Sequence, residues 1–363
     1  MAGPGGGCNL QTKSPIVDIT TLGQPVELGQ ISKELTKLWE NMAGSSSRAS
    51  LVNFAVYCRG VDALESNTQL ISEFTRNHAC RAVLLADVPE TSGQRVQAWI
   101  NAHCHLSRAG AKQVCCEQIT FLLEGASRKL LANILFANLD SDLPLHLWWQ
   151  SDIPENPNEQ LWTWVDRLIF DSRDWSAPKQ QLERLQQLLK SSGSRLIPCD
   201  LNWTRTLHLR QAAAQMFDNP ENLAHIPKID HITLAHAPGS RSTAVLFSAW
   251  IAAQLRWTQE RTDERGVAYR TPGGQNAVCT LEERAGADIS RSCFGAGDVS
   301  IDLTREEKSP YYRVEVQRDG HTTWHHLLPA GSETVVDLLD EELTSGGRHK
   351  VYIKTIPFAL AML

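Results

Sequence analysis

Residues 143–172 read LPLHLWWQSDIPENPNEQLWTWVDRLIFDS, and this stretch contains four of the 11 tryptophans in the chain. Two apolar runs, residues 143–149 and 167–170, enclose a proline-containing polar loop and a short amphipathic segment. Apolar runs of this length predict buried strands, and the segment between them predicts a short helix. A strand, a helix and a second strand form the unit from which parallel sheets are built. The stretch therefore predicts an α/β fold.

The sequence on both sides of this stretch continues the alternation of strands and helices. The expected strands are residues 51–58, 81–88, 95–105 and 113–123, and the expected helices are residues 31–42, 67–78, 126–139 and 178–190. Gly193 follows the last of these helices, as is usual at a helix end. Residues 25–193 are therefore expected to form a domain with a mainly parallel α/β layer.

Beyond Gly193 the pattern of the sequence changes. Helices are expected at residues 203–217 and 242–257, with strands at 196–201 and 229–235. Short alternating runs broken by glycine and proline predict antiparallel strands at residues 277–282, 299–303, 311–317, 322–328 and 349–356. We therefore expect a C-terminal α+β domain over residues 194–363, with a boundary uncertain by some tens of residues. Residues 1–24, rich in Gly, Pro, Ser and Thr, are expected to be a disordered lead-in.

The composition is that of an ordinary globular protein, with 42% hydrophobic and 21% charged residues. The net charge is −6 and the arginines are scattered, so no nucleic-acid partner is expected. The longest apolar run, residues 243–255, is shorter than the roughly 18 residues of a membrane helix. No membrane partner and a cytoplasmic location are expected. The nine cysteines lack regular spacing and are expected to be free thiols.

Sequence signals for catalysis, cofactors and metals are weak. Gly295 and Gly297 begin a GxG pattern, but Ser300 replaces the third glycine and no helix is expected after it, so no nucleotide cofactor is predicted. His103, Cys104 and His105 lie on a strand whose neighbour contains Cys115 and Cys116. Adjacent cysteines point to opposite faces of a strand, and this spacing matches no usual zinc motif. We predict no catalytic residue and no metal.

The loop from Pro238 to Thr243 joins an expected strand to an expected helix. Backbone N–H groups at such a position bind anions. The candidate anion-binding residues are Gly239, Ser240, Arg241 and Ser242. An ordinary turn with a Ser or Thr helix cap accounts for the same residues and is the favoured interpretation.

Residues 228–231 read Lys-Ile-Asp-His and resemble the start of a run in glucose-6-phosphate dehydrogenases. The chain then lacks the tyrosine and the substrate-binding lysine of that run, so the match is interpreted as coincidence. The alternative function considered is an enzyme or sensor that binds a sugar phosphate through the loop from Pro238 to Thr243, together with Asp230 and His231. Turnover by the chain alone would favour it.

Two cysteines are candidates for redox chemistry. Cys279 and Cys293 lie in polar sequence near Arg284 and Arg291, and a nearby positive charge lowers a thiol pKa. This pair is the first choice for a regulatory disulfide. A stand-alone thiol redox protein is disfavoured because the chain has no CxxC motif.

Several sequence blocks resemble, in order, the OpcA family of glucose-6-phosphate dehydrogenase assembly proteins, of the cyanobacterial type. The blocks are LPLHLWW at 143–149, DRLIFDS at 166–172, DLNWTR at 200–205 and AWIAAQLRW at 249–257. The resemblance implies a non-catalytic protein that binds the dehydrogenase, promotes its active oligomer and improves its response to glucose 6-phosphate. It also implies redox control, with thioredoxin as a second expected partner.

The partner-binding candidates are the tryptophans and the arginine of these blocks: Trp148, Trp149, Trp203 and Arg205. Tryptophan and arginine supply much of the binding energy at protein interfaces. Tryptophan is also highly buried on average, so these residues can equally be a structural signature of the fold. The sequence leaves both readings open.

Overall fold

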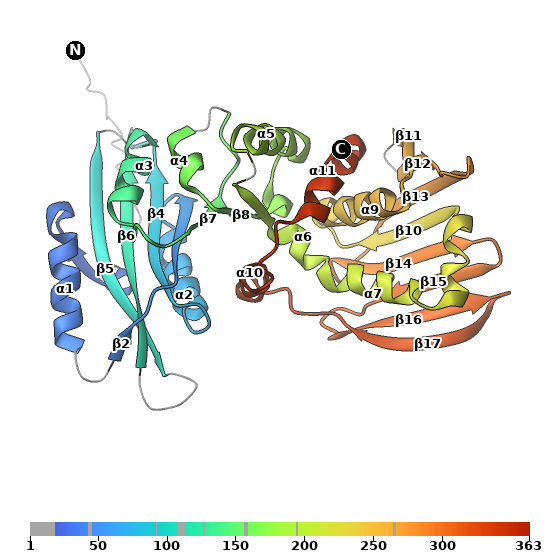
Figure 1. Cartoon of the computed structure of the whole chain (residues 1–363), viewed down its shortest axis with the longest axis horizontal. Helices are drawn as coiled ribbons and strands as arrows, with labels where there is room; N and C mark the ends of the chain where they lie inside the picture. Colours follow the sequence, from blue (N-terminus) through green and yellow to red (C-terminus); the bar gives the residue numbers. More distant parts are fainter. Residues whose placement is uncertain are drawn as a thin grey trace, which may run out of the picture.

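The computed structural model describes residues 19–42, 46–91, 93–106, 113–125, 128–155, 159–193, 195–263 and 266–363. Two sheets stand side by side, with helices α6, α9, α10 and α11 between them (Figure 1). The predicted fold class, an α/β layer followed by an α+β domain with antiparallel strands, is confirmed. Residues 1–18 of the expected lead-in lie outside the described residues, and Ile19–Leu22 form a 3-10 turn whose Leu22 is buried.

The first sheet has a doubly wound core of parallel strands. In spatial order these are β6 (Gln113–Glu124), β4 (Cys80–Val88), β3 (Val52–Arg59), β7 (Leu145–Gln150), β8 (Arg167–Phe170) and β9 (Ile197–Asp200). Strands β5 (Arg95–Leu106) and β1 (Gln24–Val26) extend the β6 side antiparallel, and β2 (Ser46–Arg48) pairs with β6 in parallel. The chain order reverses between β3 and β7, which is where open α/β sheets bind ligands.

Helices cover both faces of the first sheet, so its central strands are buried on both sides. On one face Ala55 and Tyr57 share a core with α1 (Ile31–Met42), α3 (Arg128–Ala137), α4 (Glu159–Trp164) and α5 (Pro178–Ser191). On the other face Phe54 and Val56 pack with α2 (Ala63–Phe74) and α10 (Val335–Thr344). Strand β9 lies beyond Gly193, so the first sheet closes with residues from the expected second domain.

The second sheet is antiparallel apart from the parallel pair β10–β13. Its strands in spatial order are β11 (Thr258–Asp263), β12 (Gly266–Arg270), β13 (Asn276–Glu283), β10 (His231–His236), β14 (Ile289–Ala296), β15 (Val299–Thr304), β16 (Tyr311–Arg318) and β17 (His321–Pro329). Burial alternates along β13 and β16. The buried face packs against α7 (Leu207–Phe217) and α9 (Arg241–Leu255). We call the other face the open face; it contains the exposed side chains of Val278, Tyr311 and Leu327.

Two expectations for local structure were wrong. Residues 349–356, expected as a strand, belong to helix α11 (Lys350–Met362), because its buried residues Tyr352, Ile356 and Ala359 recur at helical spacing. The helix expected at 203–217 is broken at Thr206 into α6 (Leu201–Arg205) and α7, and α8 (Pro220–Leu223) follows. None of the described helices combines the length and the apolar character that crossing a bilayer requires.

Candidate functional site

Asp200 ends β9 and begins α6 at the junction of the two domains. Its Oδ1 accepts hydrogen bonds from the backbone N–H groups of Asn202 and Ser172, both at 3.0 Å. Its Oδ2 accepts one from the Tyr352 hydroxyl at 2.9 Å. Complete burial raises the pKa of Asp200 to about 7, and the nearby charge of Asp171 adds to the rise. One carboxyl group therefore joins the 3-10 turn η3 (Ser172–Asp174), α6 and α11.

Asn202 extends this network to α9. Its Nδ2 donates to Ser172 Oγ at 3.1 Å, and its Oδ1 accepts from Thr243 Oγ1 at 2.6 Å. Its side chain is fully buried, and these partners satisfy both ends of the amide. The DLNWTR block thus forms the polar centre of the junction.

Two predicted partner-binding residues, Trp203 and Arg205, also lie in α6. Arg205 forms a two-pronged ion pair with Asp171, with Nη1–Oδ1 at 2.8 Å and Nη2–Oδ2 at 2.5 Å. The Arg210 guanidinium carbon lies 3.6 Å from the Trp203 ring centroid, in a cation–π contact. Trp203 and Arg205 are buried, so in this structure they brace the junction.

The other two candidates, Trp148 and Trp149, are neighbours in β7 and point to opposite faces of the sheet. Trp149 stacks on Tyr57 with ring centroids 3.8 Å apart and donates from Nε1 to the Asp152 carbonyl at 3.0 Å. Both indoles are buried, as is Trp162. Of the four tryptophans in residues 143–172, Trp164 is the exposed one, at 56%.

A cavity of about 400 Å³ opens where the order of the first sheet reverses, at the carboxyl ends of β3 and β7. Asn67 of α2 and Gln150 of β7 close part of this crevice with a reciprocal pair of amide hydrogen bonds of 2.9 and 2.7 Å. We call it the switch-point cavity. Its lining comprises Ala63, Ser66, Asn67, Leu70, Trp148, Trp149, Gln150, Ser151, Asp152, Asp171, Asp174, Trp175, Leu201 and Val335.

The lining of the switch-point cavity is acidic. Asp152, Asp171 and Asp174 contribute carboxyl groups, and burial, followed by the Asp171 charge, raises the pKa of Asp174. Dinucleotide sites at this position use several glycines and a helix N-terminus to hold a pyrophosphate. Here the turn between β3 and α2 contains one glycine, Gly60. Neither the charge nor the turn suits a phosphate group.

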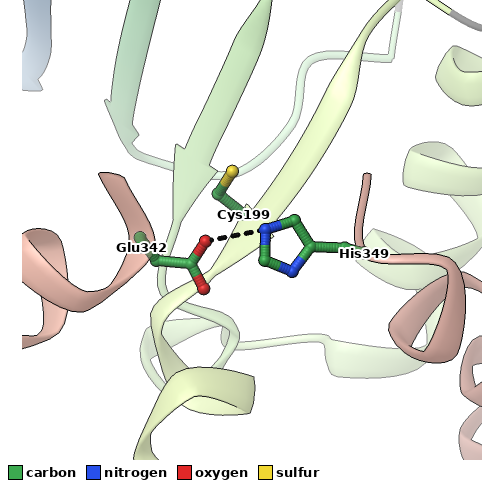
Figure 2. A group of neighbouring side chains, drawn as sticks. All are labelled: Cys199, Glu342 and His349. Carbon is green, nitrogen blue, oxygen red and sulfur yellow. Dashed lines mark ion pairs between the residues drawn. The ribbon is translucent and has the colours of Figure 1, made fainter. Parts of the chain in front are cut away.

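Three further side chains meet beside Asp200: Cys199 of β9, Glu342 of α10 and His349 at the start of α11 (Figure 2). His349 Nε2 lies 3.0 Å from Glu342 Oε2, and one ligand atom of each residue lies within 4.8 Å of the others. This group is not visible in the sequence. Glu342 and His349 are far from Cys199 in the sequence, and no spacing motif links them.

The candidate anion-binding loop is engaged within the protein. Ser240 Oγ donates to Asp288 Oδ1 at 2.7 Å rather than capping α9, and Asp288 also pairs with Arg173 at 3.2 Å. Ser242 Oγ accepts from Asn202 at 3.3 Å, Arg241 is exposed, and Gly239 has a φ of +82°. A carboxylate at this position opposes the binding of an anion.

Asp230 and His231 lie at the other end of β10 from this loop. Asp230 Oδ1 and His231 Nδ1 are 2.6 Å apart, and both side chains are more than half exposed. Six strand residues at about 3.3 Å each separate them from the loop by roughly 20 Å. The two features therefore do not form one binding site.

Cys279 and Cys293, the predicted redox pair, are free and buried. Cys279 is level with Ile232 of β10 and Cys293 with Thr233, so the two thiols point to opposite faces of the sheet. A disulfide between them requires the strands to rearrange.

The disulfide in the structure joins Cys104 of β5 to Cys115 of β6, with Cα atoms 4.1 Å apart. The expectation that all cysteines are free thiols was therefore wrong for Cys104 and Cys115. Antiparallel pairing of β5 and β6 places the two residues directly opposite each other, and this register is not visible in the spacing of the cysteines. The neighbouring Cys116 accepts a hydrogen bond from Cys80, which lowers the pKa of Cys116 to about 7. His103 is hydrogen-bonded to Gln118 at 2.7 Å.

Comparison with known families now adds to this geometry. Residues 72–187 match the family described as the glucose-6-phosphate dehydrogenase subunit N-terminal domain. Residues 198–356 match the family described as the C-terminal domain of the same subunit. Both are OpcA families. Together the two matches cover most of both domains. The chain belongs to the OpcA family. The family suggested by the sequence blocks is therefore confirmed.

Three cyanobacterial relatives are named OxPP cycle protein OpcA. The Nostoc punctiforme protein is 28% identical over 59% of this chain and 44% of its own length. The Synechocystis protein is 30% identical over 50% of this chain and 38% of its own length. The chain thus spans less than half of these two OpcA proteins. The Synechococcus elongatus protein is 26% identical over 86% of this chain and 76% of its own length.

Among solved structures, similar chains include a biliverdin reductase from Synechocystis, with a TM-score of 0.44 and 12% identity over 86% of this chain and 97% of that one. An oxidoreductase from Bacillus subtilis has a TM-score of 0.45 and 8% identity over 86% and 96% of the two chains. Scores of this size carry no information about the activity of the OpcA-family chain.

Proposed function

We propose that this chain is a non-catalytic partner protein that binds glucose-6-phosphate dehydrogenase. The observation that carries the proposal is membership of the OpcA family across both domains, whose models describe a subunit of that dehydrogenase. The switch-point cavity supports the non-catalytic part, because Asp152 and Asp174 line the place where a dehydrogenase of this topology holds a dinucleotide phosphate. The third carboxylate of the lining, that of Asp171, is already paired with Arg205.

Activation follows from preferential binding. A partner that binds the high-affinity, oligomeric state of the dehydrogenase more tightly shifts the population toward that state, by no more than its differential affinity. The apparent affinity for glucose 6-phosphate then rises, although the OpcA-family chain does not contact the substrate.

We propose the open face of the second sheet as the surface that contacts the dehydrogenase. Val278, Tyr311 and Leu327 are 45%, 50% and 56% exposed there, and Arg313 lies opposite Leu327 on the neighbouring strand. Exposed apolar side chains beside charged ones are typical of a reversible protein interface. In contrast, Trp148, Trp149, Trp203 and Arg205 are proposed to act by bracing the fold that presents this face.

Redox control is proposed to act through the Cys104–Cys115 disulfide. It links β5 and β6, and Cys104 is half-buried, whereas Cys115 is buried. Cys104 is therefore the more accessible residue of the pair. Thioredoxin reduces a disulfide by thiolate attack on one sulfur, which requires such access. Two electrons and two protons from a dithiol then give two cysteine thiols.

The test mixes the purified chain with glucose-6-phosphate dehydrogenase in oxidising and reducing buffer. Co-elution on size exclusion and a lower apparent KM for glucose 6-phosphate are expected, with a difference between the two buffers. Unchanged KM and separate elution in both buffers would refute the proposal.

A pair of charge reversals tests the contact surface. R313E on the open face is expected to weaken co-elution at least about tenfold, because a buried unpaired charge at an interface is costly. K33E, on the exposed side of α1 in the first domain, is the matched control and should bind as wild type. Equal binding by both variants would exclude the open face.

A further inference from the structure

The side chains of Cys199, Glu342 and His349 come from three elements and converge at one point next to the domain junction (Figure 2). Cys199 is fully buried and Glu342 is 2% exposed, while the His349 side chain is 12% exposed. One ligand atom of each residue lies within 4.8 Å of the other two. Among the residues that the structure describes, this is the one group of three His, Cys, Asp or Glu side chains arranged in this way.

Glu342 and His349 face each other across a buried ion pair. Glu342 Oε2 lies 3.0 Å from His349 Nε2, and neither atom has another hydrogen-bond partner. Most buried polar atoms have hydrogen-bond partners. These two atoms depend on each other, and beside the Cys199 thiol they present three ligand atoms at one point.

The donor set is one that zinc prefers. Zn²⁺ binds thiolate sulfur at about 2.3 Å and imidazole nitrogen or carboxylate oxygen at about 2.0–2.2 Å, so tetrahedral ligand atoms lie roughly 3.3–3.6 Å apart. The nitrogen and oxygen are already 3.0 Å apart, and the sulfur lies within 4.8 Å of both. Small side-chain rotations bring the three atoms to coordination distance.

Neighbouring residues hold these ligands in position. Thr204 Oγ1 donates to Glu342 Oε1, leaving Oε2 to face His349. Arg167 donates from Nη1 to Cys199 Sγ at 3.6 Å and from Nη2 to the Gly347 carbonyl at 3.4 Å. Outer hydrogen bonds of this kind orient ligands in metal sites, and a donor to sulfur favours the thiolate.

The backbone at His349 is also unusual. Its φ is +46°, a left-handed conformation that few non-glycine residues adopt. Such backbone conformations cost free energy and persist only where surrounding contacts hold them in place. They are frequent at functional sites. Here the left-handed turn begins α11, and the imidazole lies against Glu342 (Figure 2).

Glu342 and His349 also line a cavity of about 400 Å³ together with Trp203, Arg210 and Tyr352. This cavity offers room for a fourth ligand beside these two residues. Three protein ligands and one open position are the arrangement of reactive zinc sites, in which water or another donor completes the tetrahedron.

We propose that Cys199, Glu342 and His349 form a zinc site with its fourth position directed into this cavity. On binding, the Cys199 thiol loses its proton to solvent and a Zn–S bond forms. The ion pair between His349 and Glu342 breaks, the proton on His349 Nε2 also passes to solvent, and each of the two residues forms one bond to the metal. The two negative ligands neutralise the ion, and Arg167 keeps its hydrogen bond to the sulfur. The site is independent of dehydrogenase binding.

The test uses Co²⁺ as a spectroscopic probe on the reduced full-length chain, without the dehydrogenase. Binding of one Co²⁺ per chain, with a thiolate-to-cobalt charge-transfer band and intense visible bands of tetrahedral geometry, is expected. Stoichiometric Zn²⁺ should abolish these bands and raise the melting temperature. Absence of the charge-transfer band would overturn the proposal.

Variants assign the ligands. C199S should remove the charge-transfer band, and H349Q or E342Q should weaken Co²⁺ binding at least about tenfold. Circular dichroism and thermal melting of the metal-free variants report whether each one folds. The matched controls are C58S, another buried thiol, and H321Q, an exposed histidine, which should bind Co²⁺ as wild type. A band that persists in folded C199S assigns the metal elsewhere and overturns the proposal.

Discussion

The guanidinium of Arg205 and the carboxylate of Asp171 form a two-pronged ion pair at 2.8 and 2.5 Å, across the junction of the two domains. The arginine side chain is 2% exposed and the aspartate 12%. An ion pair this deeply buried holds its two elements in one relative position, because either charge without its partner is strongly disfavoured away from water.

We expect R205A to lower the free energy of unfolding by about 3 kcal/mol, because Asp171 then remains as an unpaired buried charge. Urea unfolding of the full chain measures the change. R59A is the matched control: its ion pair with Glu90 is exposed on both sides, and its loss should change stability by less than about 1 kcal/mol. Equal effects of the two variants would contradict the prediction.

Asp200 makes stability depend on pH. Its pKa is raised from 3.8 to about 7, so between about pH 4 and 7 the folded chain keeps a proton that the unfolded chain has lost. The unfolded state binds fewer protons there, and this group therefore lowers stability as the pH rises through that window.

D200N removes this titration. Its stability relative to wild type should therefore improve from pH 4 to pH 7, by about 4 kcal/mol at 1.36 kcal/mol per pKa unit. Urea unfolding at several pH values measures the difference. His146, whose pKa is lowered to about 4 mainly by burial, gives the opposite slope in both proteins and cancels. A pH-independent difference would show that Asp200 does not titrate in this range.

Removing the Cys104–Cys115 disulfide should destabilise the oxidised chain. The bond closes a loop with a sequence separation of 11, for which chain entropy gives roughly 2–3 kcal/mol. The double variant C104S/C115S should melt below wild type in oxidising buffer, and the two should converge after reduction with dithiothreitol. Equal melting temperatures in oxidising buffer would mean that the bond does not constrain the fold.

The tryptophans of residues 143–172 separate into structural and accessible positions. W149A should lower stability by about 3–5 kcal/mol, because it removes a buried ring stacked on Tyr57. W164A, at an exposed ring, should change stability by about 0.5 kcal/mol. Thermal and urea unfolding measure both. A large loss in W164A, or a small one in W149A, would reverse this assignment.

The strands and helices of the first domain could be predicted from the sequence because the spacing of apolar residues within each element indicates its type. Strand β5 and helix α5 begin where expected, since alternation and leucine spacing report burial directly. The strand expected at residues 349–356 was wrong because Pro357 within α11 is a poor helix signal and a short apolar run fits a strand as well as a helix.

The site was less predictable for the same reason. The DLNWTR block could be recognised, but its partners Tyr352, Glu342 and Thr243 lie far along the chain. Whether Trp203 faces solvent or is buried depends on those distant elements. Likewise, the face to which a cysteine points depends on strand register, which hydrophobic pattern alone does not fix for Cys279 and Cys293.

The hydrogen bond between Tyr352 and Asp200 has a consequence for synthesis of the chain. Its two residues are 152 positions apart, which a ribosome adding about 5–20 residues per second covers in about 8–30 s. Throughout that interval the first sheet has its last strand, but the acid at the end of that strand lacks the hydroxyl that satisfies it. The first domain therefore emerges with an incomplete edge, and its final folding step awaits translation of α11.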